Sequence, residues 1–211
     1  IDRVIAGLEK KRVMSVKERE IVAYHESGHA IVATVLPGLD PVHKISIVQR
    51  GFGALGYTMQ LPLEDRYLMQ RRDLENQLAV LLGGRSAEEI ALKDISTGAQ
   101  NDLQRATDIA RAMVTEFGMS DSLGVVNYDA NKRQRFLDIP MPQERGLYAE
   151  ETAQKIDAEI KRIVTDAHNT ARRILTENRE KLERVTRRLL GVEVMEGDEL
   201  RRLLELQAAA S

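Results

Sequence analysis

Residues 25 to 29 read His25-Glu26-Ser27-Gly28-His29, which is the pattern H-E-x-x-H. Two histidines four positions apart share one face of an α-helix, separated by one turn and about 6 Å of rise. Both imidazoles can therefore bind a single Zn²⁺, whose bonds to histidine nitrogen are about 2.0–2.1 Å long. The pattern thus requires a helix here, with its histidine face turned toward a metal.

Glu26 is too close to His25 in sequence to bind the same metal from the same face. It can instead act as the general base that takes a proton from the attacking water. Two inward histidines can also be plain core residues satisfied by backbone hydrogen bonds. The spacing and the intervening glutamate favour the metal, so the chain is predicted to be a zinc hydrolase, and more narrowly a peptidase.

The flanking sequence contains a start and a stop signal for this helix, predicted over residues 16–36. Ser15 and Glu18 form an S-x-x-E capping box, and Pro37-Gly38 ends the pattern. The histidines and the apolar residues recur in steps of three and four, at Ile21, His25, His29, Val32 and Leu36. The histidines are therefore expected on the face that points into the core.

Composition restricts the ligands and the partners. The 211 residues include no cysteine, so nitrogen and oxygen must supply every metal ligand, as suits a reducing compartment. A net charge of −2 and 4% aromatic residues give no reason to expect nucleic-acid binding. No apolar run reaches the roughly 18–20 residues of a membrane span. The fragment itself is therefore expected to be soluble and to make no membrane contact.

The remaining chain predicts a mainly α fold with one small β element. Residues 43–48 alternate and are rich in β-branched side chains, and 57–60 follow a glycine-rich connection, so the two form a small sheet. Helical periodicity covers the rest, at 64–82, 85–92, 99–117, 144–179 and one or two short helices within 180–206. The stripe from Ala149 to Ile174 suits either a coiled-coil seam or a helix packed on its own core, and the second is favoured.

A catalytic zinc needs a third protein ligand and an open position. The zincin class that uses H-E-x-x-H-x-x-G-x-x-H is excluded, because Val32 and Val35 stand where it has glycine and histidine. His43 and His168 lie on the predicted strand and the long helix, and both are interpreted as structural or surface residues. A carboxylate is the better candidate.

Asp102 is favoured as that carboxylate. It lies in an otherwise apolar helical stripe formed by Ala99, Asp102, Ala106, Ile109 and Met113, and a buried carboxylate needs a cation nearby. An ion pair with an arginine, or a favourable place in the first helical turn, are the alternatives. Glu88 and Glu89 remain open as ligands, although Arg85 is within reach of both.

Several motifs together resemble the FtsH family, the membrane-anchored ATP-dependent zinc proteases of the AAA class. They occur in the family's order and span nearly the whole chain: IDRVIAG at 1–7, VAYHESGHA at 22–30, ALGYT at 54–58, GGRSAEE at 83–89, STGAQNDL at 96–103 and FGMS at 117–120, followed by matching residues within 151–157. The resemblance covers the peptidase portion only, because the chain has no G-x-x-x-x-G-K-[ST] phosphate-binding loop.

The resemblance implies a helical zincin-type peptidase domain with a small sheet near the active site. His25, His29 and Asp102 would hold one Zn²⁺ per chain, and Glu26 would be the catalytic base. ATP would act only through an ATPase domain absent from this chain. The intact proteins are hexamers with a membrane anchor, so the whole protein is expected at the cytoplasmic face of a bacterial inner membrane. Unfolded or misassembled proteins would be its substrates.

The domain expectations follow from the same comparison. Residues 1–14 are expected to be a linker or the end of a preceding ATPase region, 15–206 the zinc peptidase domain, and 207–211 a frayed tail. Two positions depart from the family pattern. Ser27 replaces a small apolar residue off the histidine stripe, where little effect is expected, and Phe136-Leu137-Asp138 lacks a glycine.

Two further roles are assigned to residues near the site. Leu55, Gly56, Tyr57 and Thr58 are expected to form a strand along which an extended substrate adds through backbone hydrogen bonds. Asn101 is a candidate for orienting the metal ligands from outside. The rival hypotheses are a zincin with a glutamate as third ligand, and a non-catalytic helical oligomerisation module with a vestigial metal site.

Overall fold

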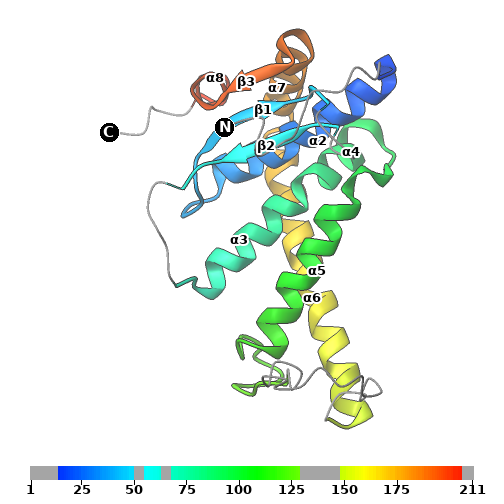
Figure 1. Cartoon of the computed structure of the whole chain (residues 1–211), viewed down its shortest axis with the longest axis vertical. Coiled ribbons are helices and arrows are strands. Elements are labelled where there is room, and N and C mark those ends of the chain that lie inside the picture. Colours follow the sequence, from blue (N-terminus) through cyan, green and yellow to red (C-terminus); the bar gives the residue numbers. More distant parts are fainter. Residues whose placement is uncertain (1–13, 50–54, 63–67, 129–147, 206–211) are drawn as a thin grey trace, which may run out of the picture.

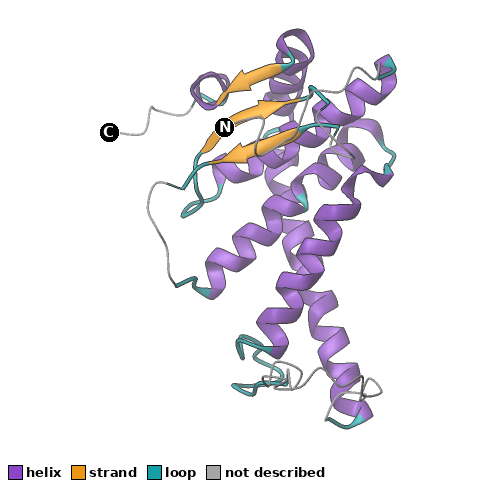
Figure 2. Ribbon diagram, in the orientation of Figure 1, coloured by secondary structure: helices purple, strands orange, loops and turns teal. Residues whose placement is uncertain are grey.

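The computed structural model describes residues 14–49, 55–62, 68–128 and 148–205. Helices make up most of it, and a small three-stranded sheet lies to one side of its upper half (Figure 2). Helices α3, α5 and α6 extend from that half toward the opposite end of the molecule (Figure 1). The mainly α class with a small β element is therefore confirmed.

The helix that bears the H-E-x-x-H pattern is α2, Val16–Val35. Its predicted capping box is present: the backbone N–H of Glu18 donates to Ser15 Oγ at 3.2 Å, and the backbone N–H of Ser15 donates to the Glu18 carboxylate at 2.8 Å. The helix is buried almost all round between Val22 and Ala33. It is thus the central helix of the core and not an amphipathic surface helix.

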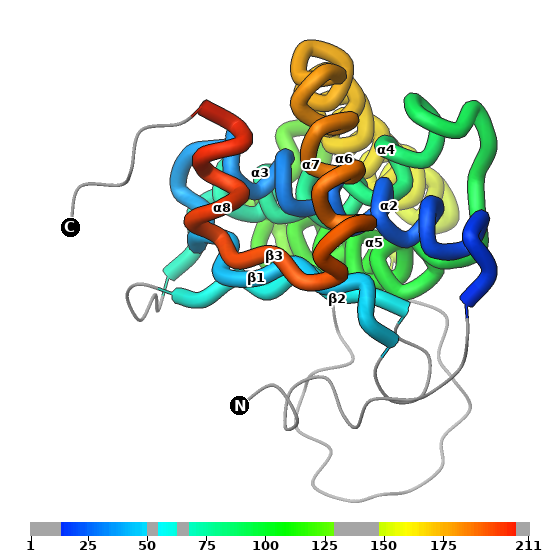
Figure 3. Tube along the Cα trace, turned by 90° about the horizontal axis from the view of Figure 1, so that it is seen from above, coloured from blue at the N-terminus to red at the C-terminus, as the bar shows by residue number. Residues whose placement is uncertain are grey.

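The sheet is antiparallel, with strand order β2-β1-β3. Strands β1, Val42–Ser46, and β2, Tyr57–Gln60, match the predicted β element. Strand β3, Val194–Glu196, is an addition that the sequence analysis missed, because three residues are too few for a visible alternation. Strand β2 is one edge of the sheet, which lies along α2 and α7 (Figure 3).

The other helices are α3, Arg71–Leu81; α4, Gly83–Leu92; α5, Gln100–Thr115, after a 3₁₀ turn at Thr97–Ala99; α6, Glu150–Glu177; α7, Arg179–Val192; and α8, Gly197–Leu203. The predicted stripe of α6 is buried from Ile156 to Ile174 against α3, α4 and α5. The long helix therefore packs on its own core, as favoured, and not as a coiled-coil seam.

The predicted start of α3 at residue 64 is wrong. Residues 68–70 are not helical, and the backbone N–H of Gln70 donates to the Asp73 carboxylate at 2.9 Å, which caps a helix beginning at Arg71. Leu68 fits the helical repeat of apolar residues, but it lies outside the helix and is 90% exposed. Counting it in the repeat made the predicted helix too long.

Some expectations fall outside the described residues, namely the proposed linker at 1–14 except for Met14, the proposed tail at 207–211, and the Phe136-Leu137-Asp138 departure. Among the described residues, no helix combines the length and apolar character needed to cross a membrane.

Candidate metal centre

Two glycines bring α4 against the histidine face of α2. A Cβ atom on Gly28 would overlap the carbonyl oxygen of Gly83, and one on Gly83 would lie 2.9 Å from the carbonyl oxygen of Gly28. Both positions therefore require glycine for the two backbones to approach this closely. This contact fixes the position along α2 at which the next residues of α4 face the histidines.

Three side chains converge beside this contact. The Nε2 atoms of His25 and His29 are 3.0 Å apart, and Oδ2 of Asp102 is 3.3 Å from the first and 3.4 Å from the second. A tetrahedral zinc with bonds of about 2.0–2.1 Å places its ligand atoms about 3.3 Å from one another. The three distances fit that geometry, and these residues form a group suited to a metal ion.

The opposite ring nitrogens are fixed by strong acceptors. His29 Nδ1 donates to the carbonyl oxygen of Val80 at 2.7 Å, which leaves its Nε2 as the lone-pair atom. His25 Nδ1 lies 2.7 Å from Oε1 of Glu88, whose second oxygen accepts the backbone N–H of Ser96 at 2.7 Å. Such contacts hold both rings with Nε2 toward the metal position.

Glu88 and Glu89, which the sequence leaves as equal candidates, have different places in the structure. Glu88 is buried on the outer side of His25, while Glu89 pairs with Arg85 at 3.3 Å and lies 3.1 Å from His168 of α6. The structure brings Asp102, and neither glutamate, to the Nε2 side of the histidines. His43 is exposed on β1, away from the group.

The orienting contact that we assigned to Asn101 is made by Glu88, while Asn101 is exposed at the rim. A signal for this was available in the sequence. Gly84 and Glu88 are four positions apart and share one face of α4, whereas Glu89 is turned by about 100° from it.

Two carboxylates, those of Asp102 and Glu88, lie against the buried histidine His25. Burial lowers the pKa of His25, but hydrogen bonds to Asp102 and Glu88 outweigh it and raise that pKa to about 9. Burial raises the pKa of Asp102, yet its contacts with both histidines hold it far below its usual range. The pKa of Glu88 is lowered as well, by His25 and Ser96 against the effect of burial. Such a cage favours a bound cation.

Glu26 lies next to the ligand group and belongs to a different set of contacts. It is buried, and Oγ1 of Thr58 donates to its Oε2 at 2.8 Å. Burial raises the pKa of Glu26, while His29, His25 and Thr58 lower it by less. A carboxylate whose pKa is shifted toward neutrality is suited to general-base chemistry.

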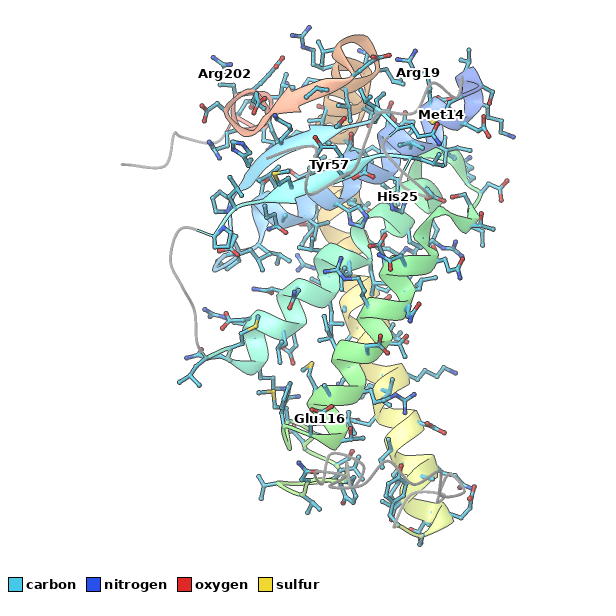
Figure 4. The ribbon with its side chains drawn as sticks, viewed as in Figure 1. Met14, Arg19, His25, Tyr57, Glu116 and Arg202 are labelled. Atoms are coloured by element: carbon cyan, nitrogen blue, oxygen red, sulfur yellow. The ribbon has the colours of Figure 1, made fainter. Side chains whose placement is uncertain are left out.

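A cleft of about 830 Å³ opens over these residues. The three ligand candidates, Glu26 and Asn101 line it, and so do the four residues predicted as the substrate strand. Of these four, Tyr57 and Thr58 lie in β2, while Leu55 and Gly56 precede it and are not part of a strand. In Figure 4, His25 lies between β2 and the upper ends of α4 and α5, with Tyr57 on the adjoining strand. The edge strand and the metal group therefore share one cleft.

Gly84 leaves no room for a side chain beside the ligands. A Cβ atom there would lie 2.5 Å from Nε2 of His25 and 2.6 Å from Nε2 of His29. We therefore expect Gly84→Ala to displace the histidines and lower zinc affinity at least tenfold, an estimate scaled to losses of about 10–100-fold when outer contacts of metal ligands are removed. Zinc competition against a chromogenic chelator measures this.

Gly191→Ala is the matched control, since a Cβ atom at that position of α7 meets nothing within 4 Å. Its zinc affinity should equal that of the unmodified chain. Wild-type affinity in Gly84→Ala would show that the metal does not sit against this glycine.

Comparison with known proteins places the chain among peptidases. Residues 12–203 match the model of peptidase family M41. The chain is 56% identical to the ATP-dependent zinc metalloprotease FtsH of Syntrophobacter fumaroxidans over 205 residues, which are 97% of this chain and 32% of that protein. It is 54% identical to FtsH 4 of Synechocystis and 49% identical to FtsH of Thermotoga maritima, each over 97% of this chain and 33% of the relative. The chain thus spans about a third of the length of these relatives.

Proposed function

The chain belongs to peptidase family M41, and we propose that it is a zinc-dependent endopeptidase, the proteolytic portion of a longer ATP-dependent protease. The observation that carries this proposal is the convergence of His25, His29 and Asp102 at ligand distances, beside a buried glutamate in a cleft. Three ligands of this kind leave one position open, as catalytic zinc sites do.

The chain's own residues account for most of the reaction. His25, His29 and Asp102 would hold the ion. The chemistry that zinc supplies in such a site is activation of the attacking water and polarisation of the scissile carbonyl. Glu26 would take a proton from the water and pass it to the leaving amine.

The edge of the sheet suggests how the substrate binds. Among the described residues, strand β2 pairs with a neighbour on one side only, and Tyr57, Thr58 and Gln60 of this strand line the cleft with Glu26. An extended polypeptide can add to such an edge through backbone hydrogen bonds. This mode depends little on side chains, which suits a protease that degrades unfolded or misassembled proteins.

The rival hypotheses receive less support. A glutamate ligand is disfavoured because Glu88 lies behind His25 and Glu89 pairs with Arg85. A vestigial module has no need for a buried base in an open cleft, yet Glu26 is retained.

The finer expectations concern the whole protein and stay proposals. The relatives are named ATP-dependent, so we propose that an ATPase in the same polypeptide delivers substrate to this site. We likewise propose a hexamer attached to the cytoplasmic face of a bacterial membrane.

The decisive test compares a flexible and a folded substrate. The 211-residue chain should cleave casein, and a zinc chelator should stop it, because the chain carries zinc chemistry but no nucleotide-binding loop. It should leave a tightly folded protein intact with or without ATP. Gel assays of both substrates measure this. Chelator-resistant casein cleavage would contradict the zinc site. ATP-stimulated degradation of the folded protein would contradict the proposal that a separate ATPase delivers such substrates to this site.

A further inference from the structure

We infer that Thr58 positions the catalytic base: its hydroxyl fixes one oxygen of the Glu26 carboxylate and leaves the other for the attacking water. This inference rests on the proposed peptidase function. Thr58 does not touch the reacting atoms, so it acts through Glu26 and is a positioning residue.

The hydrogen bond joins two elements that are far apart in sequence. Thr58 lies on β2, where it pairs with Ile45 of β1, and this register fixes the place of its side chain. Its Oγ1 is 2.8 Å from Oε2 of Glu26 and 3.2 Å from the backbone carbonyl oxygen of Glu26. A hydroxyl has a single proton to donate, and the shorter distance assigns it to the carboxylate.

The second oxygen of Glu26 has a different environment. Within the described part of the chain, no hydrogen bond reaches Oε1, whereas Oε2 is taken by Thr58. The backbone of Gly56 passes close to this oxygen: a Cβ atom on Gly56 would lie 2.9 Å from Oε1. Glycine therefore keeps the space beside Oε1 clear, on the side of the carboxylate that Thr58 does not occupy.

A fixed base has a kinetic advantage. Glutamate has several rotatable bonds, and ordering its carboxylate before substrate arrives removes orientations that do not lead to proton transfer. The same strand carries the backbone groups proposed to bind substrate. One element would therefore set the position of both the substrate and the base, and this places the effect of Thr58 on kcat more than on KM.

Thr58→Val tests this, because valine keeps the shape of threonine and lacks the hydroxyl. With a quenched-fluorescence peptide and the zinc-loaded chain, kcat should fall about 10–100-fold, the scale on which small misplacements of reacting groups act. KM should stay within about twofold and zinc should remain at one per chain. Thr58→Ser, which keeps the hydroxyl, should recover kcat to within about threefold of wild type.

Two further variants guard against trivial explanations. Thr58→Ala also lacks the hydroxyl and cannot overpack, so it replaces valine if that variant does not fold. Thr165→Val is the matched control, since the Thr165 hydroxyl only donates to the carbonyl oxygen of Lys161 on an exposed part of α6. It should leave kcat and KM unchanged.

Three results would overturn the inference: wild-type kcat in Thr58→Val and Thr58→Ala, a serine variant as slow as valine, or a loss confined to KM. Failure of the proposed function looks different, because the unmodified chain itself would then lack zinc-dependent hydrolysis.

Discussion

Replacing Glu26 by glutamine should abolish nearly all peptide hydrolysis while one zinc per chain stays bound. Glu26 lies beside the ligand group and outside it, with Oε2 held by Thr58 at 2.8 Å. Glutamine has the same shape and can keep that contact, but its amide cannot accept the water proton. Loss of a general base typically costs about 10²–10⁴ in rate. Peptide kinetics and metal analysis of the same preparation measure the two effects.

Glu89→Gln is the control for this variant, because it neutralises a carboxylate on a neighbouring helix that pairs with Arg85 and lies outside the ligand group. It should retain both zinc and activity. An active Glu26→Gln variant would mean that another group takes the proton. An inactive variant without zinc would mean that Glu26 supports the metal and leaves its catalytic role unproven.

Local chemistry was the part of this fold that could be read from sequence. The capping box at Ser15 and Glu18 and the long stripe of α6 both depend on residues within a few positions of one another. The break between α3 and α4 is less exact, because it falls at Leu82 and both glycines predicted to interrupt the helix lie within α4. The H-E-x-x-H spacing likewise works within one helix, since it needs only the rise and twist of that helix.

Contacts between segments far apart in the sequence could not be predicted from it. Strand β3 exists because Met195 pairs with Ile45, which lies 150 positions earlier. No pattern within three residues can predict such a pairing. The face of α4 that turns toward α2 likewise comes from packing, and only once it is known does the place of Glu88, one turn after Gly84, distinguish it from Glu89. These features depend on tertiary packing, which the spacing of apolar residues in the sequence does not predict.

Ser27 shows the same limit. We expected little effect from it, because it lies off the histidine stripe. Yet α2 is buried on several faces, and the Ser27 hydroxyl is fully buried without a hydrogen-bond partner among the described residues. An unpaired buried polar group costs roughly 1–3 kcal/mol. The hydroxyl is therefore a local cost to stability, for which the structure offers no compensating contact.

Asp102→Ala should release zinc and abolish activity, and it tests the assignment that sequence alone left open. Two histidines hold a zinc ion weakly and leave it too open, because catalytic sites use three protein ligands. The structure orders the acidic residues by their distance from the metal position: Asp102 beside both Nε2 atoms, Glu88 behind His25, and Glu89 facing α6. The loss of zinc affinity on substitution should therefore be largest at Asp102, smaller at Glu88 and absent at Glu89.

We therefore expect Glu88→Gln to weaken zinc by about 10–100-fold, the usual cost of losing an outer-shell partner. Asp102→Ala should weaken it by more than that, and Glu89→Ala should not change it. Chelator competition on the three variants, with thermal unfolding to establish that each is folded, gives the ranking. Wild-type zinc affinity in a folded Asp102→Ala variant, together with complete loss in Glu88→Gln, would transfer the third ligand to Glu88 while leaving the hydrolase proposal intact.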